Sequence, residues 1–262
     1  NETVLITADS AANFAPMAFA DVGCAMGKTG TDVAKSNADV VVFDDSFSTI
    51  VKAIRNARGI FGNFSKYVNY YLTMCSGLLF SVLMHILFFR TVAPSTATLL
   101  LSAVFTLLYP IVCLGYETAD IDIMKQAPHT VGEKLFDIGE SILSAAYGLL
   151  VAVPSVIVYL INMNSPSAAT ASFLALVLSF ICYMLTGRST DLFYRRIIHN
   201  RFLLLISAAC ILLSIIIAAT PVGVLFGLKV ITAKGLLSAF LLPLSILLIF
   251  EAKKLINKHL KK

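Results

Sequence analysis

The sequence predicts a mainly α-helical membrane protein, in which a six-helix transmembrane bundle follows a partial α/β domain. Hydrophobic residues make up 58% of the 262 residues and charged residues only 13%, whereas a soluble domain has about 25% charged residues. Six long stretches also lack Asp, Glu, Lys and Arg in their interiors. These observations argue against a water-soluble protein and predict the lipid bilayer as a partner. No nucleic-acid partner is expected.

Charge separates the first quarter of the chain from the rest. Residues 1–69 carry 6 basic and 7 acidic side chains, whereas residues 70–262 carry 14 and 8. The formal charge of +5 therefore belongs to the apolar part. Together with the elements below, this division predicts four regions. They are 1–45, the C-terminal part of an α/β domain; 46–69, a stalk helix; 70–250, the transmembrane domain; and 251–262, a basic cytoplasmic tail.

The N-terminal region reads as the end of a parallel sheet. Apolar runs at 4–7, 21–26 and 40–44 predict strands, and residues 31–38 predict a helix between the last two. Such alternation is typical of a doubly wound fold, in which sites form at the carboxyl ends of the strands. Asp9 follows the first predicted strand. The chain has no initiator Met before this strand, which indicates that it begins inside a domain.

A long helix is predicted to join the two parts of the chain. It begins after Ser46, an acceptable N-cap residue, and its apolar pattern continues without proline into the first membrane span. Gly59 and Gly62 are its only weak points.

Six stretches are long enough to cross a bilayer, which requires about 20 apolar residues as a helix. The predicted spans are 70–89, 97–116, 141–161, 168–186, 202–220 and 235–250. Cytoplasmic loops collect Lys and Arg. The loops at 117–140 and 187–201 and the tail from Glu251 hold 2, 4 and 5 basic residues, whereas the other side holds Arg90, Lys229 and Lys234. Both ends of the chain are therefore expected to be cytoplasmic.

His85 is the single ionisable side chain in the interior of a predicted span. It lies near the outer end of that span, where a snorkelling or hydrogen-bonded histidine is a better interpretation than a ligand.

Several ordered motifs resemble those of P-type cation-transporting ATPases of the calcium and sodium–potassium pump type. They include Ala20-Asp-Val-Gly-Cys-Ala-Met-Gly27, Gly30-Thr-Asp-Val-Ala-Lys35, Ala38-Asp39, Asp44-Asp45-Ser-Phe-Ser-Thr-Ile50, Gly115-Tyr-Glu117, Met124-Lys125, Leu185-Thr-Gly-Arg188-Ser189, Phe226-Gly227 and Glu251-x-x-Lys254. The resemblance implies a haloacid-dehalogenase-like phosphorylation-domain remnant, followed by the last six helices of such a pump. It also implies ATP-driven cation transport, with Mg²⁺ and ATP as cofactors of the complete protein.

The resemblance covers only about the last third of a pump. The family's aspartate nucleophile, nucleotide-binding domain, actuator domain and first four spans have no counterpart in these residues. The chain alone is therefore expected neither to form an aspartyl-phosphate nor to bind either cofactor tightly. The missing N-terminal portion of the pump is an expected partner.

The hinge departs from the family pattern Thr-Gly-Asp-Gly-x-Asn-Asp-x-Pro, whose carboxylates and Asn serve Mg²⁺ and the phosphoryl group. The corresponding segment is Thr7-Ala-Asp-Ser-Ala-Ala-Asn-Phe-Ala-Pro16. Asp9 is kept, and the resemblance implies that it contacts Mg²⁺. With one inserted residue Asn13 takes the Asn position and Phe14 the second Asp; without it, Ala12 and Asn13 take them. In both alignments one carboxylate is missing.

The transport site departs further. The family's fifth span carries Asn-x-x-Glu and its sixth carries Asn-x-x-Thr-Asp, and Phe180 stands where its eighth span often has a polar residue. The positions in the fifth and sixth spans are here Cys75, Leu78, Ala103, Thr106 and Leu107. Only Thr106 offers a side-chain oxygen, whereas Ca²⁺ takes 6–8 oxygen ligands.

Three interpretations remain open. The chain is the C-terminal portion of a working cation pump, or a degenerate, non-catalytic relative with a structural or regulatory role in the membrane, or part of a P-type ATPase for a non-cation substrate such as a lipid. The missing ligands favour the second, and the motifs favour the first as the family label.

Overall fold

The computed structural model describes residues 3–10, 12, 14–90, 95–115, 123–125, 138–187 and 201–260. The chain divides into two compact units: residues 1–62 with 118–135, and residues 63–117 with 136–262. Tyr116, Glu117, Arg188 and Ser189, which belong to motifs of the sequence, lie outside the described residues.

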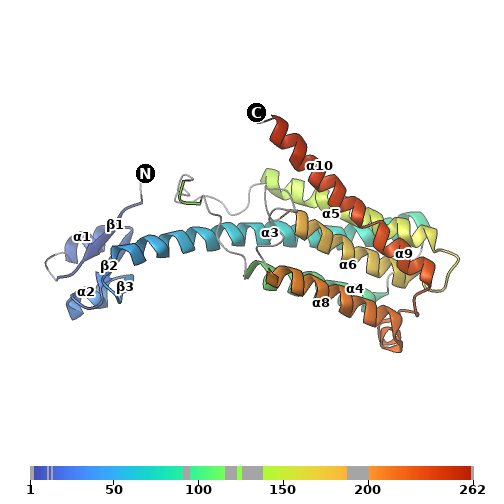
Figure 1. The fold of residues 1–262 in the computed structure, drawn as a ribbon, viewed down its shortest axis with the longest axis horizontal. Helices are drawn as coiled ribbons and strands as arrows, with labels where there is room; N and C mark the ends of the chain where they lie inside the picture. The colour runs from blue at the N-terminus through green and yellow to red at the C-terminus, as the bar shows by residue number, and fades with distance from the viewer. Residues whose placement is uncertain are drawn as a thin grey trace. The chain divides into compact units, whose positions relative to one another are not determined.

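The first unit contains a small parallel sheet (Figure 1). The strands β1 (Leu5–Ala8), β2 (Val22–Met26) and β3 (Val40–Val42) lie in the order β1-β2-β3. In register, Leu5 pairs with Val22 and Cys24 with Val40. Helices α1 (Phe14–Phe19) and α2 (Asp32–Asn37) connect the strands. The strands lie close to the predicted runs, and α1 is an addition that the sequence analysis missed. The short 3-10 helix η2 (Ile123–Lys125) also belongs to this unit.

Helix α3 runs without interruption from Phe47 to Phe89. It begins after Ser46, as predicted, and neither Gly59 nor Gly62 breaks it. A helix of its 43 residues is about 65 Å long, so the predicted first span is the last part of a much longer rod.

The second unit is a helical bundle (Figure 1). After α3 come α4 (Thr96–Gly115), α5 (Ile138–Ile161), α6 (Ala168–Gly187), α8 (Arg201–Ala219), the 3-10 helix η4 (Pro221–Phe226), α9 (Ala233–Leu241) and α10 (Leu244–Leu260). Six segments of the described chain are long and apolar enough to cross a membrane, as predicted. The last of them, Ala233–Ile256, is divided at Leu242–Pro243, a break that the sequence analysis did not predict.

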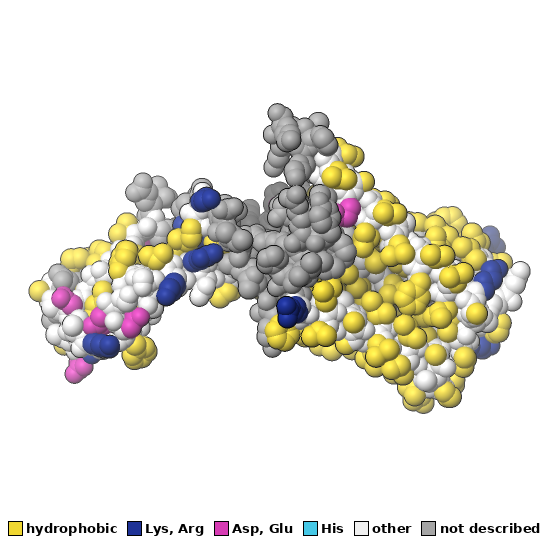
Figure 2. All heavy atoms as spheres, in the orientation of Figure 1, with side chains coloured by type: hydrophobic (Ala, Val, Ile, Leu, Met, Phe, Trp, Pro, Cys, Tyr) yellow, Lys and Arg dark blue, Asp and Glu magenta, His cyan; other side chains and the backbone are white. Residues whose placement is uncertain are grey.

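Helix α6 forms the centre of the bundle. It packs against α4, α5, α8, α9 and α10, and 89% of its most apolar stretch is buried inside the protein, against 28 to 44% for the other spans. The outer surfaces of the surrounding helices are largely apolar (Figure 2). An apolar exterior is the surface that a bilayer, unlike water, can cover.

Candidate functional site

The first candidate site lies at the carboxyl end of the small sheet. Asp9 follows β1 directly, and its side chain is exposed. Its main-chain carbonyl accepts a hydrogen bond from the Thr31 amide at 2.9 Å, so the residue helps to hold the start of α2. Ala12 is exposed. Asn13 lies outside the described residues, and the side chain of Phe14 also lies outside them.

Asp45 organises the loop that follows β2. Its carboxylate accepts hydrogen bonds from the amides of Lys28 at 2.9 Å and Thr29 at 2.8 Å, and these bonds lower the pKa of Asp45. The backbone approaches closely here, because a Cβ atom on Gly27 would lie 2.7 Å from the Cα atom of Phe43. Gly27 is thus required sterically.

Asp44 serves the start of α3 instead. It accepts a hydrogen bond from the Thr49 hydroxyl at 2.6 Å and one from the Ser46 amide at 3.2 Å. Both bonds favour the ionised carboxylate and lower its pKa. The carboxylates of Asp44 and Asp45 are therefore occupied by backbone and hydroxyl donors.

The described residues do not fit a magnesium site. Mg²⁺ requires near-octahedral oxygen coordination, usually with carboxylates. Within the described ranges, no three His, Cys, Asp or Glu side chains lie together in a way that could hold a metal ion. Asp9 has no partner carboxylate in such a group, so no catalytic step through Mg²⁺ follows from this part of the chain.

The predicted transport positions lie on α3 and α4 and differ in their surroundings. Cys75 is exposed on the surface of α3, and Leu78 and Ala103 are half-buried. Thr106 is buried, and its hydroxyl donates a hydrogen bond to the Ala103 carbonyl at 2.9 Å. Leu107 belongs to α4, but its side chain lies outside the described residues.

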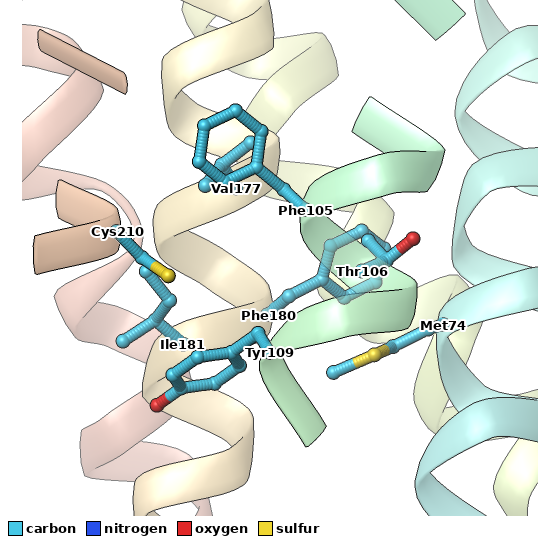
Figure 3. A pocket seen from close by; sticks show the side chains of 8 residues that line it. All are labelled: Met74, Phe105, Thr106, Tyr109, Val177, Phe180, Ile181 and Cys210. Atoms are coloured by element: carbon cyan, nitrogen blue, oxygen red, sulfur yellow. The ribbon is translucent and has the colours of Figure 1, made fainter. Parts of the chain in front are cut away.

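A small cavity borders Thr106 (Figure 3). Its volume is about 10 Å³, at the lower limit for one water molecule. Its walls come from α3, α4, α6 and α8, and the lining residues are Met74, Phe105, Thr106, Tyr109, Val177, Phe180, Ile181 and Cys210. The hydroxyl of Tyr109 is paired with Ser207 Oγ at 2.7 Å. Among the positions named from the sequence whose side chains the structure describes, only Thr106 and Phe180 line this cavity.

Phe180 fills the space between α6 and α3. The residue is 2% exposed, and its ring lies so close to Gly77 that a Cβ atom there would come within 2.9 Å of it. The other lining residues were not found from the sequence. Cys210 and Ile181, for example, carry no motif, and helix pairing alone brings them to this place.

His85 is a hydrogen-bonded core residue. It is fully buried, and its Nδ1 atom lies 2.7 Å from the Ser81 carbonyl. Since a carbonyl can only accept, Nδ1 donates, and Nε2 is left to accept from the Ser172 hydroxyl at 3.4 Å. The Tyr159 ring packs edge to face against the imidazole, with 4.9 Å between the ring centroids. The hydrogen-bonded interpretation is confirmed, and snorkelling is wrong.

The apolar helices and the family relationship together define a multi-pass integral membrane protein. Residues 95–256 match the family described as "Cation transporting ATPase, C-terminus". The match covers more than half of the chain, which therefore belongs to this family and represents a C-terminal portion of a P-type cation ATPase.

Several relatives agree with this assignment. The chain is 28% identical over 282 residues to "Calcium-transporting ATPase 1" of Bacillus cereus, covering 98% of this chain and 31% of the relative. It is 30% identical over 226 residues to a "Calcium-transporting ATPase" of Bacillus subtilis, covering 83% and 25%. It is 37% identical over 146 residues to "Sodium/potassium-transporting ATPase subunit alpha-B" of Artemia franciscana, covering 55% and 14%. The chain thus spans less than a third of the length of these curated relatives.

Proposed function

We propose that this chain is the membrane domain of a P-type ATPase-like transport protein whose family cation positions no longer bind a divalent ion. The observation that carries the proposal is the state of Thr106. It has the one side-chain oxygen among the positions named from the family motifs of the fifth and sixth spans, and that hydroxyl is already bonded to Ala103.

The energetic argument concerns the hydration shell of the ion. Ca²⁺ gives up its water only where 6–8 oxygen ligands replace it, usually with carboxylates among them. One hydroxyl bond returns only about 1 kcal/mol. The neighbouring cavity has room for at most one water molecule and is walled by Met74, Phe105 and Phe180. This combination favours an apolar packing function over ion coordination.

The same observation favours the non-catalytic alternative, a structural or regulatory membrane protein that retains the fold of a pump. Mg²⁺ and ATP belong to this proposal only through a separate N-terminal portion, with Asp9 as the remaining hinge carboxylate. Lipid transport ranks behind, because the cavity beside Thr106 is far too small for a lipid headgroup. The basic loops support a cytoplasmic position for both ends of the chain.

Calcium binding tests the proposal directly. We expect no saturable binding of radioactive Ca²⁺ at micromolar concentration to the detergent-solubilised chain. Saturable binding that disappears in Thr106→Val would contradict the proposal, because main-chain carbonyls near Pro110, the proline inside α4, would then complete a site around this hydroxyl.

A restoring variant serves as the matched control. Leu78→Glu combined with Leu107→Asp returns two carboxylates to the family positions. We expect measurable Ca²⁺ affinity in this double variant and none in Leu78→Gln with Leu107→Asn, which has a similar shape but lacks the charges. A folded double variant that binds no Ca²⁺ would show that the helix packing itself differs from that of a calcium pump.

A further inference from the structure

We propose that the loop between α8 and α9 inserts its tip into the headgroup layer of the bilayer. The tip consists of Val222, Val224 and Leu225 on η4. These side chains are 50%, 63% and 80% exposed within the protein. Three exposed apolar side chains on one short turn present a surface that water solvates poorly.

The loop presents this tip in a defined way. Leu228, just after it, is 2% exposed and anchors the loop in the bundle. Gly227 has a φ of 75°, and its amide donates to the Val224 carbonyl at 3.0 Å. The Leu228 amide donates to the Gly223 carbonyl at 2.9 Å. The chain therefore turns Leu228 inward and leaves Leu225 outward.

Residues at the beginning of α4 also hold this turn by hydrogen bonds. The hydroxyls of Ser95 and Thr98 both donate to the Phe226 carbonyl, at 3.0 and 2.8 Å. A Cβ atom on Gly227 would lie 2.9 Å from Ser95 Oγ, so this close contact also requires glycine. The tip is therefore exposed even though hydrogen bonds hold the loop in place.

The surroundings indicate lipid as the occupant. The tip continues the apolar exterior of α8, on which Leu212 and Leu213 are 61% and 51% exposed. In Figure 2 apolar side chains extend over the lower right of the bundle, where Figure 1 shows the loop, and Lys and Arg side chains lie along the right-hand edge.

The charges nearby are of one sign. Arg90, Lys229 and Lys234 are exposed, and the described loops that join α5 to α6 and α8 to α9 contain no acidic residue. Apolar side chains flanked by Lys and Arg are the pattern of segments that lie in the membrane interface, where phosphates meet the cations and acyl chains meet the apolar groups.

Tryptophan fluorescence tests the proposal without a signal from native tryptophan, because the chain contains no Trp. Leu225→Trp is prepared as the full chain and reconstituted in vesicles of phosphatidylcholine and phosphatidylglycerol. The lipids carry bromine either near the headgroup end of the acyl chain or near its terminal methyl. Asn164→Trp, at an exposed position in the loop between α5 and α6, is the matched control for the interfacial preference of Trp itself.

We expect the fluorescence of the Leu225→Trp variant to lie at shorter wavelength than that of the Asn164→Trp control and to be shielded from iodide. Bromine near the headgroup end should quench it several-fold more than bromine near the methyl end. Val224→Trp should show the same emission and quenching, so that the result does not depend on a local disturbance in one variant.

Two results would overturn the proposal. Quenching by iodide without quenching by bromine, in both variants, would place the tip in water. Short-wavelength emission without bromine quenching would mean that protein covers the tip, and dependence on the protein-to-lipid ratio would identify that protein as a second copy of the chain.

Discussion

Asp45 shows how one side chain can organise a loop. It adopts a φ of 55°, unusual for a residue with a side chain, and in that position its carboxylate reaches the amides of Lys28 and Thr29. The family motifs located this residue in the sequence but assigned it no role, because a side chain that bonds to backbone 16 or 17 residues away leaves no local pattern.

We predict that Asp45→Asn loosens this loop. In the full chain in detergent at neutral pH, amide hydrogen exchange of residues 27–30 should become faster, since the amide side chain has only one acceptor oxygen. Asp32→Asn, at an exposed position in the first turn of α2, should leave this exchange unchanged. Equal exchange in the wild type and Asp45→Asn would contradict the role of the carboxylate.

Acid should weaken the contribution of Asp45 to the stability of this loop. Hydrogen bonding lowers the pKa of Asp45 in the folded chain, so its contribution is complete above the unfolded value of about 3.9. The contribution is lost as the pH falls through the lower folded value. We therefore expect the difference between wild type and Asp45→Asn to disappear in acid; a difference that persists below both pKa values would have another origin.

The sequence shows which side chains stand at the transport positions, but it does not predict what surrounds them. The sequence identifies Thr106 as the one oxygen-bearing side chain among them, but it does not reveal the bond that this hydroxyl donates to the Ala103 carbonyl. The exposure of Cys75 on α3 depends on how the helix is rotated about its axis, which an apolar stretch with little polar contrast does not reveal.

At the scale of elements, glycines control how α3, α5 and α6 approach one another. A Cβ atom on Gly148 of α5 would lie 2.6 Å from the Thr73 carbonyl and 2.7 Å from the Gly77 amide nitrogen. A Cβ atom on Gly77 would instead meet the ring of Phe180 first, at 2.9 Å. A Cβ atom on Gly148 would also meet the Ser76 hydroxyl, but its two backbone contacts cannot be removed by shortening a side chain, whereas the nearest contact of Gly77 can.

This difference predicts which substitution can be rescued. Gly77→Ala and Gly148→Ala should each lower stability in detergent, with overpacking costing about 1–3 kcal/mol and Gly148→Ala the more harmful. Adding Phe180→Ala should relieve Gly77→Ala but not Gly148→Ala, as measured by thermal unfolding of all single and double variants. Additive effects in the Gly77–Phe180 pair would rule out the predicted contact.

The positions of the spans could be predicted because the bilayer imposes a minimum apolar length on each one. The break at Pro243 could not, since a proline is compatible with a membrane helix wherever other groups satisfy the freed backbone. At this break the amide and the hydroxyl of Ser245 both donate to the Leu242 carbonyl, at 3.0 and 2.6 Å. Whether a neighbouring serine makes such bonds depends on the local turn.

At the scale of the whole molecule, the testable property is topology. In a variant with the native cysteines replaced, Lys229→Cys and Lys258→Cys should react with impermeant maleimide from opposite sides of the membrane, since one span separates them. Lys52→Cys, ahead of the first membrane-crossing part of α3, should react from the same side as Lys258→Cys. Labelling of Lys229→Cys and Lys258→Cys from one side would refute the predicted arrangement.

The burial of α6 also bears on how the protein is made. Ribosomes deliver α6 to the membrane before α8, α9 and α10 exist, although these three helices later cover much of its surface. The nascent α6 therefore enters the membrane with only α3, α4 and α5 available to cover Ser172 and Ser179, both of which are buried in the finished bundle. Because most of its side chains are apolar, α6 can remain in lipid until the later helices cover it. Truncation after residue 200 would leave this central helix permanently without its cover, and quality-control proteases of the membrane would then meet its uncovered surface.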